Sequence, residues 1–399
     1  MNSTHLIVSE SRDHLQSETI KAMKRIMFSV GEASGDMHAA NIIKALRSKN
    51  PNLEFYGMGG EKLRSAGAEL LVDCTDIAVM GIVEVIFKYA QIKAALNTLQ
   101  ESLRNSPPDL LVLVDYQAFN FKLAATAKES GIKVLFYISP KIWAWRPKRV
   151  YEIAKIIDMM AVIFPFEEKI YKDANVPVRF VGNPLVDKAK AQKDKASCFK
   201  DYGLITDRTV IGLFPGSRRS EIKRLLPIQL AAADLLLQSK PDLQFILPIA
   251  STLNDDDFTQ YLNQYRHLNI KLVKDLPYNV MQCCDAIIAA SGTATLEIAL
   301  MGIPSCIIYK IALLSYFIVK PLVKIKHVGL VNIVAEKEIV KEFLQFDARP
   351  QVIADEINLI LDNKIYRQNM IAELNAVRDN LGKTGGTENM AELILEMLG

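Results

Sequence analysis

Residues 28–45 read FSVGEASGDMHAANIIKA, and this stretch decides the fold class. A short apolar run ends at a glycine, passes through the turn GEASGD (31–36) and enters a helical pattern. A strand, a glycine turn and a helix in this order predict an α/β unit built around a parallel sheet. Whether the turn holds a nucleotide is a question that its residues alone leave open.

The same alternation of apolar runs and helical patterns continues along the chain. Six strands are expected in the first half, at 25–30, 53–58, 109–114, 133–138, 158–164 and 178–182. Five more are expected later, at 209–214, 243–249, 270–274, 285–290 and 305–309. Two α/β halves with a ligand cleft between them are therefore predicted.

The chain divides at a charged stretch that is poor in large apolar residues. We expect a flexible extension at 1–24, a first domain at 25–186, a linker at 187–207, a second domain at 208–349 and C-terminal helices at 350–399. The composition of the linker is typical of a flexible connection. Met23 lies two residues before the first strand and is an alternative start of the chain.

Composition excludes several classes of protein. The net charge of +3 is too small to indicate a nucleic-acid partner. The five cysteines form no CxxC pair and the five histidines are scattered, so free thiols in the cytoplasm are expected and a metal site is not. No stretch reaches the roughly 18 apolar residues of a membrane span.

The stretch FPGSRRSEIKRLLP (214–227) follows a strand and opens a helix. Gly216 permits close approach of a ligand, and Ser217 can cap the helix and donate a hydroxyl. Arg218 adds a two-pronged donor beside the amides of the helix start, which favours a phosphate. The alternative is an ordinary capped turn with surface arginines.

The stretch AASGTATLEIALMGIP (289–304) has the same layout. Small residues, Ser291, Gly292, Thr293 and Ala294, again lead from a strand into a helix, and Glu297 one turn later can accept from a ribose diol. Two such helix starts suit a nucleoside diphosphate. The alternative assigns Glu297 to the helix dipole only.

Two loops of the first half carry further candidates. In VDYQAFN (114–120), Asp115 ends an apolar strand and can take a proton from a hydroxyl, or can simply cap its loop. We expect Asn120 to cap the next helix. SPKIWAWRPKRV (139–150) joins tryptophans such as Trp143 to cations such as Arg146, which suits a sugar, a phosphate or a lipid headgroup as well as a packed loop.

Residues 78–99, read as one helix, have an apolar arc wider than the usual stripe of roughly 100°. The stretch 310–327 is also apolar and is edged by lysines. Both favour peripheral contact with an anionic membrane, although a wholly buried helix is the alternative for the first. The residues expected to contact lipid or acyl chains are Ile82, Val83, Val85, Ile86 and Tyr89.

Several ordered motifs together resemble the lipid-A-disaccharide synthase family, glycosyltransferases of Gram-negative endotoxin assembly. They are GEASGD (31–36), AVMGIVEV (78–85), SPKIWAWRPKRV (139–150), FPFE (164–167), PGSR (215–218), ASGTATLE (290–297) and KEFLQ (341–345). The resemblance implies two Rossmann-like domains of the B-type glycosyltransferase fold, whose C-terminal helices cross back or swap into a partner chain. A homodimer is therefore left open.

The resemblance also implies a reaction and a location. The family joins UDP-2,3-diacylglucosamine to 2,3-diacylglucosamine 1-phosphate, giving a β-1,6-linked disaccharide phosphate and UDP, at the inner face of the cytoplasmic membrane. It implies an inverting displacement without a cofactor, in which Asp115 is the base and Arg218 stabilises the leaving UDP.

Further roles follow from the resemblance. The nucleotide is expected on the second domain, at 216–218, at 291–297 and at Asn332, which matches a family asparagine near the donor. The turn 31–36 is then no dinucleotide loop. The residues expected near the acceptor are Glu32, Ser34, Gly35, Asp36, Trp143 and Arg146.

Two departures from the family pattern bear on these expectations. Val331 stands where the family usually has proline, and Gln117-Ala118 replace a Pro-Gly or Pro-Asp pair after Asp115. Two rivals therefore stay open: another UDP-sugar enzyme of this fold, such as a 2-epimerase, or a silent binder of nucleotide or lipid. The apolar arc at 82–99 favours an acylated substrate over a soluble one.

Overall fold

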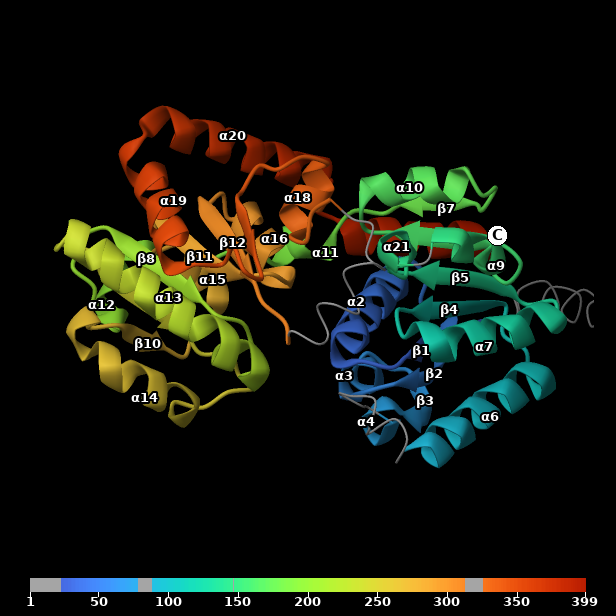
Figure 1. Cartoon of the computed structure of the whole chain (residues 1–399). Coiled ribbons are helices and arrows are strands. Elements are labelled where there is room, and N and C mark those ends of the chain that lie inside the picture. The colour runs from blue at the N-terminus through green and yellow to red at the C-terminus, as the bar shows by residue number, and fades with distance from the viewer. Residues whose placement is uncertain (1–22, 78–87, 146, 313–325) are drawn as a thin grey trace, which may run out of the picture.

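The computed structural model describes residues 23–77, 88–145, 147–312 and 326–399. These residues form two α/β domains that lie side by side, each built around one parallel sheet (Figure 1). The predicted α/β class with two Rossmann-like domains is therefore confirmed. Residues 1–22, which cover nearly all of the expected N-terminal extension, lie outside the described residues.

The first sheet has seven strands in the order β3-β2-β1-β4-β5-β6-β7. Their bounds are β1 Lys24–Val30, β2 Leu53–Gly59, β3 Glu69–Asp73, β4 Leu110–Val114, β5 Lys133–Tyr137, β6 Met159–Val162 and β7 Val178–Phe180. Six of them match predicted strands, and β3 was not predicted. The order reverses between β1 and β4, which makes that pair the switch point of the sheet.

The second sheet has six strands in the order β10-β9-β8-β11-β12-β13. Their bounds are β8 Val210–Phe214, β9 Gln244–Pro248, β10 Lys271–Val273, β11 Ala286–Ala290, β12 Ser305–Tyr309 and β13 Glu342–Leu344. The five predicted strands are present, and β13 is the addition. Here the switch point lies between β8 and β11.

Helices cover both faces of the first sheet. On one face α2 and the C-terminal α21 pack on Ile26, Phe28 and Val30, and on the other α6 and α7 pack on residues such as Met27. The helices of this domain are α2 Ala33–Lys49, α3 Glu61–Ser65, α4 Cys74–Ile77, α6 Tyr89–Asn105, α7 Gln117–Glu129, α8 Ile142–Trp145, η1 Pro147–Arg149, α9 Val150–Ile153 and α10 Pro165–Lys172.

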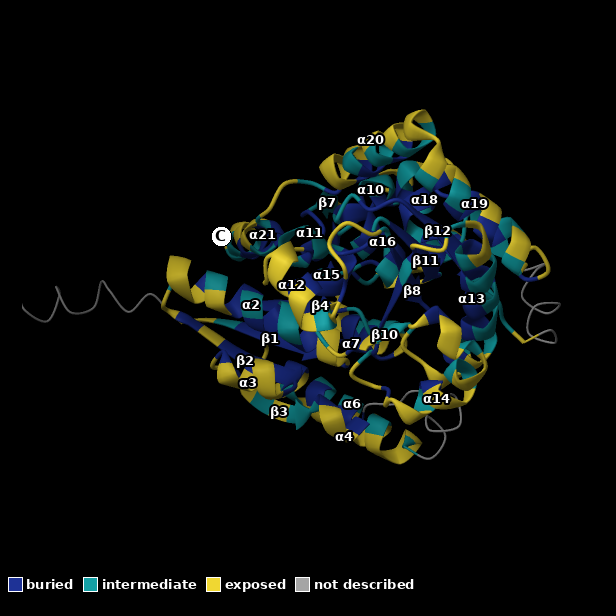
Figure 2. Ribbon diagram, turned by 90° about the vertical axis from the view of Figure 1, so that its left-hand side faces the viewer, coloured by how far each residue is buried: buried dark blue, intermediate teal, exposed yellow. Residues whose placement is uncertain are grey.

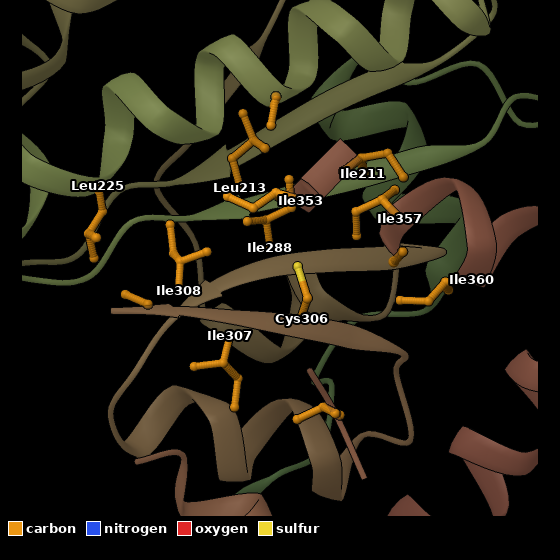
Figure 3. Close-up of a cluster of buried hydrophobic side chains, with 14 of the residues drawn as sticks. Ile211, Leu213, Leu225, Ile288, Cys306, Ile307, Ile308, Ile353, Ile357 and Ile360 are labelled. Atoms are coloured by element: carbon orange, nitrogen blue, oxygen red, sulfur yellow. The ribbon is translucent and has the colours of Figure 1, made fainter. Parts of the chain in front are cut away.

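The second sheet is covered in the same way. Its larger core joins β8, β11 and β12 to helices α13 and α19, and Figure 3 shows Ile288 and Cys306 facing Ile353 and Ile357 in this cluster. The helices of this domain are α12 Lys195–Tyr202, α13 Arg219–Ser239, α14 Asp256–Leu262, η2 Asn263–Leu268, α15 Pro277–Met281, α16 Thr293–Leu300, α18 Leu330–Ala335, α19 Pro350–Asp362 and α20 Lys364–Asn380. The last helix, α21 Gly386–Leu398, lies on the first domain.

The stretch 187–207, expected as a flexible linker, is largely folded. It contains α12, whose Asp194 side chain caps the helix by accepting from the Ser197 amide. Cys198 and Phe199 are buried with Phe214 and Ile246 in the second domain. All lysines of this stretch except the half-buried Lys188 are exposed, so its composition resembles a linker although one face of its helix belongs to a core.

The C-terminal helix returns to the first domain, one of the two outcomes left open by the sequence. α21 packs on α2, and Asn389 Nδ2 donates to the Val181 carbonyl at 3.1 Å. The chain crosses between the domains a first time near Gly182 and a second time near Gly386. A Cβ on Gly182 would lie 3.4 Å from the Cα of Gly386, so the two crossings touch at glycine.

The motif FPFE (164–167) joins the domains through side chains. Phe164 is buried in the large core of the second domain, and the Phe164 and Phe166 rings stack with centroids 5.7 Å apart. Figure 2 shows the strands dark blue at the centre and the exposed yellow residues on the outer helices. No helix in the described ranges is long and apolar enough to cross a membrane.

Candidate active site

The sequence motifs gather at the two switch points, because parallel strands end at one edge of their sheet. In the first domain the turn 31–36 follows β1 and the loop 115–116 follows β4, and Val30 and Val114 are paired neighbours. In the second domain the loop 215–218 follows β8 and the loop 291–292 follows β11. Both pairs of predicted motifs are thus brought together.

Asp115 is held in a strained turn. Both Asp115 (φ 48°) and Tyr116 (φ 46°) adopt left-handed backbone conformations, which are costly for residues with a Cβ. Tyr116 lies over Gly31, where an added Cβ would come within 2.3 Å of the ring. The absence of a side chain at Gly31 therefore makes room for the Tyr116 ring. This position of the ring allows the turn that carries Asp115.

Asn120 fastens this turn, which corrects its predicted role as a helix cap. The buried side chain accepts from Ser29 Oγ at 2.6 Å and donates to the Asp115 carbonyl at 2.7 Å. It therefore ties the end of β1 to the end of β4 from inside α7. The sequence did not reveal this contact because Ser29 and Asn120 are 91 positions apart.

The pKa values of the Asp115 and Glu32 carboxyl groups are both raised at this edge. Burial raises the pKa of Asp115, and the Tyr116 amide and the Lys141 ammonium oppose the rise. Partial desolvation, followed by the charge of Asp115, raises the pKa of Glu32. A raised pKa brings a carboxylate closer to the basicity that proton abstraction near neutral pH requires.

The other predicted residues of the turn 31–36 are either exposed to solvent or buried in structural contacts. Ser34 is exposed, whereas Gly35 is buried against Val30, whose Cγ1 would lie 2.9 Å from an added Cβ. The Asp36 carboxylate accepts from the amides of Gly60, Lys62 and Leu63 at 2.7–3.2 Å and so caps α3. Its expected position near the acceptor stays a prediction, and what the structure adds is a structural role.

Trp143 lies against α10. Its indole Nε1 donates to Glu167 Oε1 at 3.2 Å, and its ring packs edge-on against Phe166. Glu167 is almost fully buried, its Oε2 has no hydrogen-bond partner among the described residues, and burial raises its pKa to about 7. These contacts fit the alternative of a packed loop for the half-buried Trp143, whose place near the acceptor stays a prediction, while Arg146 lies outside the described residues.

The backbone amides of the loop 215–218 already bind a carboxylate of the protein. Glu221 Oε2 accepts from the amides of Ser217 and Arg218 at 2.9 and 3.2 Å, so Glu221, and not Ser217, caps α13. Gly216 (φ 107°) makes room, because an added Cβ would lie 2.3 Å from Glu221 Oε2. The Arg218 side chain is 79% exposed and remains accessible to an anion.

The loop 291–292 is open by comparison. Among the described residues, no side chain caps α16 and no atom lies within 4 Å of a Cβ added to Gly292. Gly292 and Thr293 are exposed, Ala294 is half-buried, and the Ser291 hydroxyl donates to the Val328 carbonyl. Of the two predicted anion sites, the start of α16 is the one without a protein carboxylate on its amides.

Glu297 and Asn332 have different environments. Glu297 is half-buried, and its Oε1 accepts from the hydroxyl of Tyr278 at 2.8 Å, a contact that the sequence did not reveal. Asn332 is fully buried, and its amide makes four hydrogen bonds to Ile339, Val340 and Glu342. These use its whole capacity, so Asn332 has no group left for a substrate.

Most residues predicted to contact lipid or acyl chains lie outside the described residues. This holds for Ile82, Val83, Val85 and Ile86 and for most of the stretch 310–327. Tyr89 begins α6 and is 59% exposed, whereas Leu99 of the same helix is buried in the core. The described part of the predicted helix therefore has one exposed aromatic residue at its start and a core-facing side.

Comparison with known proteins identifies a family. The profile of the family described as lipid-A-disaccharide synthetase matches residues 26–396. Lipid-A-disaccharide synthases of Geobacter metallireducens and Trichlorobacter lovleyi are 46% and 47% identical to this chain, over 94% of it and 98% of each relative. That of Coxiella burnetii strain CbuG_Q212 is 40% identical, over 94% of this chain and 99% of the relative.

Solved structures show the same fold at low sequence identity. The UDP-GlcNAc 2-epimerase of Neisseria meningitidis, bound to UDP-GlcNAc, superposes with a TM-score of 0.62 at 14% identity, covering 94% of this chain and 99% of that one. The calicheamicin glycosyltransferase CalG4 superposes with a TM-score of 0.58 at 13% identity, covering 95% and 99%.

The buried Glu167 predicts a pH dependence of stability. Its pKa of about 7 exceeds the ordinary 4.5, so the folded state binds the proton more tightly and stability falls as pH rises from about 4.5 through 7. Glu167→Gln should remove this fall in the melting temperature between pH 5 and 8. The gain at pH 8 should be roughly 2–4 °C for each kcal/mol recovered in a domain of this size.

Glu168→Gln is the matched control. Burial raises the pKa of Glu168, but hydrogen bonds from Lys172 and the Phe180 amide outweigh burial and lower the pKa overall. Glu168 therefore stays charged over this pH range. Its substitution should leave the slope of melting temperature against pH unchanged. A Glu167→Gln variant that kept the wild-type slope would contradict the assignment.

Proposed function

This chain belongs to the lipid-A-disaccharide synthetase family, and on that premise we propose how its residues carry out the family reaction. It is a glycosyltransferase that joins UDP-2,3-diacylglucosamine to 2,3-diacylglucosamine 1-phosphate. The products are the β-1,6-linked disaccharide 1-phosphate and UDP. The observation that carries this conclusion is the match over residues 26–396, together with relatives up to 47% identical across 94% of the chain.

Asp115 is the base in this proposal. The acceptor 6-hydroxyl gives its proton to the Asp115 carboxylate while its oxygen attacks the anomeric carbon of the donor. The bond from that carbon to the diphosphate oxygen breaks, and UDP leaves with the electron pair. Support comes from the place of Asp115 at the first switch point and from the fixed turn that presents it.

The second domain holds the nucleotide in this proposal. The start of α16 offers amides without a capping side chain, and the exposed guanidinium of Arg218 can meet the charge that grows on the leaving diphosphate. Glu297, oriented by Tyr278, accepts from the ribose diol. A phosphate at the loop 215–218 has to displace Glu221, so we place the diphosphate nearer to α16.

Peripheral membrane contact is the second part of the proposal. The substrates carry acyl chains, and the residues that flank the stretch 78–87 in the described structure include the exposed Tyr89. Tyr151 is 60% exposed and follows the basic pair Lys148 and Arg149. Aromatic and basic side chains on one domain suit the boundary of an anionic membrane.

A single assay tests the function and the ion requirement together. Purified protein is incubated with UDP-2,3-diacylglucosamine, radiolabelled 2,3-diacylglucosamine 1-phosphate, detergent and a chelator. We expect labelled disaccharide, because cationic and amide groups of the protein stabilise the leaving UDP. Product with magnesium only would overturn the charge-stabilisation scheme. No product with either addition, while UDP still binds, would point to a different acceptor.

Asp115→Asn should lower kcat by about 10²–10⁴, the range for loss of a general base, and leave the Kd for UDP unchanged. Steady-state kinetics and calorimetry measure the two quantities. Asp109→Asn is the matched control, because Asp109 lies just before the opposite end of β4 and pairs with Lys24 away from the switch point. Near-normal turnover of Asp115→Asn would require another base, and Glu32 is the neighbouring carboxylate.

Replacing Val83 and Ile86 by aspartate should reduce co-sedimentation with vesicles that contain anionic lipid. Withdrawing two apolar side chains from lipid costs roughly 1.5–3 kcal/mol each, so a loss of more than about tenfold in partitioning is expected. Ile365→Asp is the control, since Ile365 is 72% exposed on the second domain. Unchanged co-sedimentation would assign Val83 and Ile86 to the core.

A further inference from the structure

Lys188 ends α11 (Pro184–Lys188), the short helix on the first crossing between the domains. Figure 1 shows α11 between the two domains, and α11 contacts both α16 and α21. The Lys188 ammonium donates to the Met37 sulfur at 3.6 Å. A thioether is a weak acceptor, and no carboxylate among the described residues forms an ion pair with this half-buried group.

The charges around Lys188 come from both domains. Burial and the nearby Lys62 at the start of α3 lower the pKa of Lys188, and Glu297 on α16 opposes them. Burial, then Lys188, lowers the pKa of neighbouring His38 to about 4, so that imidazole is neutral. Glu297 already accepts from Tyr278. The Lys188 ammonium therefore lies near a second ammonium, and the carboxylate that opposes their effect, Glu297, already accepts a hydrogen bond.

We propose that Lys188, backed by Lys62, holds a phosphate group of a substrate between the two domains. A partly desolvated ammonium gains most from an anion that supplies several acceptor oxygens, and lysine is a common partner of phosphate. Its neighbour Glu297 is the residue assigned to the ribose. The inference rests on the proposed function, because both substrates carry phosphate: the donor a diphosphate and the acceptor a 1-phosphate.

Calorimetry with UDP and with uridine tests the inference. Lys188→Gln removes a charged hydrogen bond, so its Kd for UDP should rise at least about tenfold while its Kd for uridine stays unchanged. Lys62→Gln, on the exposed face of α3, should weaken UDP binding in the same direction by a smaller factor. Lys190→Gln is the matched control, because Lys190 is exposed two positions further along.

Kinetics distinguish the two sources of phosphate. If Lys188 meets the acceptor, the variant keeps its affinity for UDP but has a raised KM for 2,3-diacylglucosamine 1-phosphate and an unchanged KM for the acceptor without phosphate. Either pattern supports a phosphate site. The inference is overturned if neither ligand is affected, or if uridine and UDP weaken by the same factor. The calorimetry needs no turnover, so an inactive protein would count against the reaction and not against the site.

Discussion

The side-by-side pairing of β1 with β4 is the constraint on which the first half of the candidate site depends. Val30 and Val114 are register partners, so the turns that follow them emerge at one level and bring Glu32 and Asp115 together. Asn120 then holds the two turns in this position, because its side chain accepts from Ser29 of β1 and donates to the carbonyl of Asp115, which follows β4. Burial of this amide, with its hydrogen bonds satisfied, holds a turn whose backbone is otherwise unfavourable.

Carboxylates on backbone amides form a recurring pattern in this molecule. Asp36 caps α3, Glu221 caps α13, and Glu342 accepts from the amides of Val328 and Gly329 at the start of α18. Each occupies donors that a phosphate could otherwise bind. In the described part of the chain no carboxylate accepts from the amides at the start of α16, so this helix start differs from the three that carry one.

The sequence predicted the fold well and the site in part. Apolar runs identified the buried strands, but β3 and β13 were missed because their residues are charged or only half-buried at the sheet edges. The motifs located both switch points. The side chains that contact these motifs could not be predicted, because contacts such as that of Lys188 with Met37 join residues 151 positions apart. The role of Asn332 could not be predicted either, because only its surroundings show that its hydrogen-bonding groups are all used within the protein. α12 was missed because it has only 8 residues, of which just Cys198 and Phe199 are buried, too few to show a helical period.

Two glycines, Gly182 and Gly386, lie close together where the two crossings between the domains meet. Asn183 N bonds to the Leu381 carbonyl beside them, so both segments pass through one small region of backbone contact. The two segments are therefore tied to each other by hydrogen bonds from the backbone and from side chains, the Asn389 amide among them. An alanine at Gly386 would place its Cβ 3.4 Å from the carbonyl oxygens of Val181 and Gly182, which is an ordinary van der Waals distance. Gly182 (φ 93°) has a left-handed backbone that is costly for any other residue, so the second crossing tolerates a methyl group and the first does not.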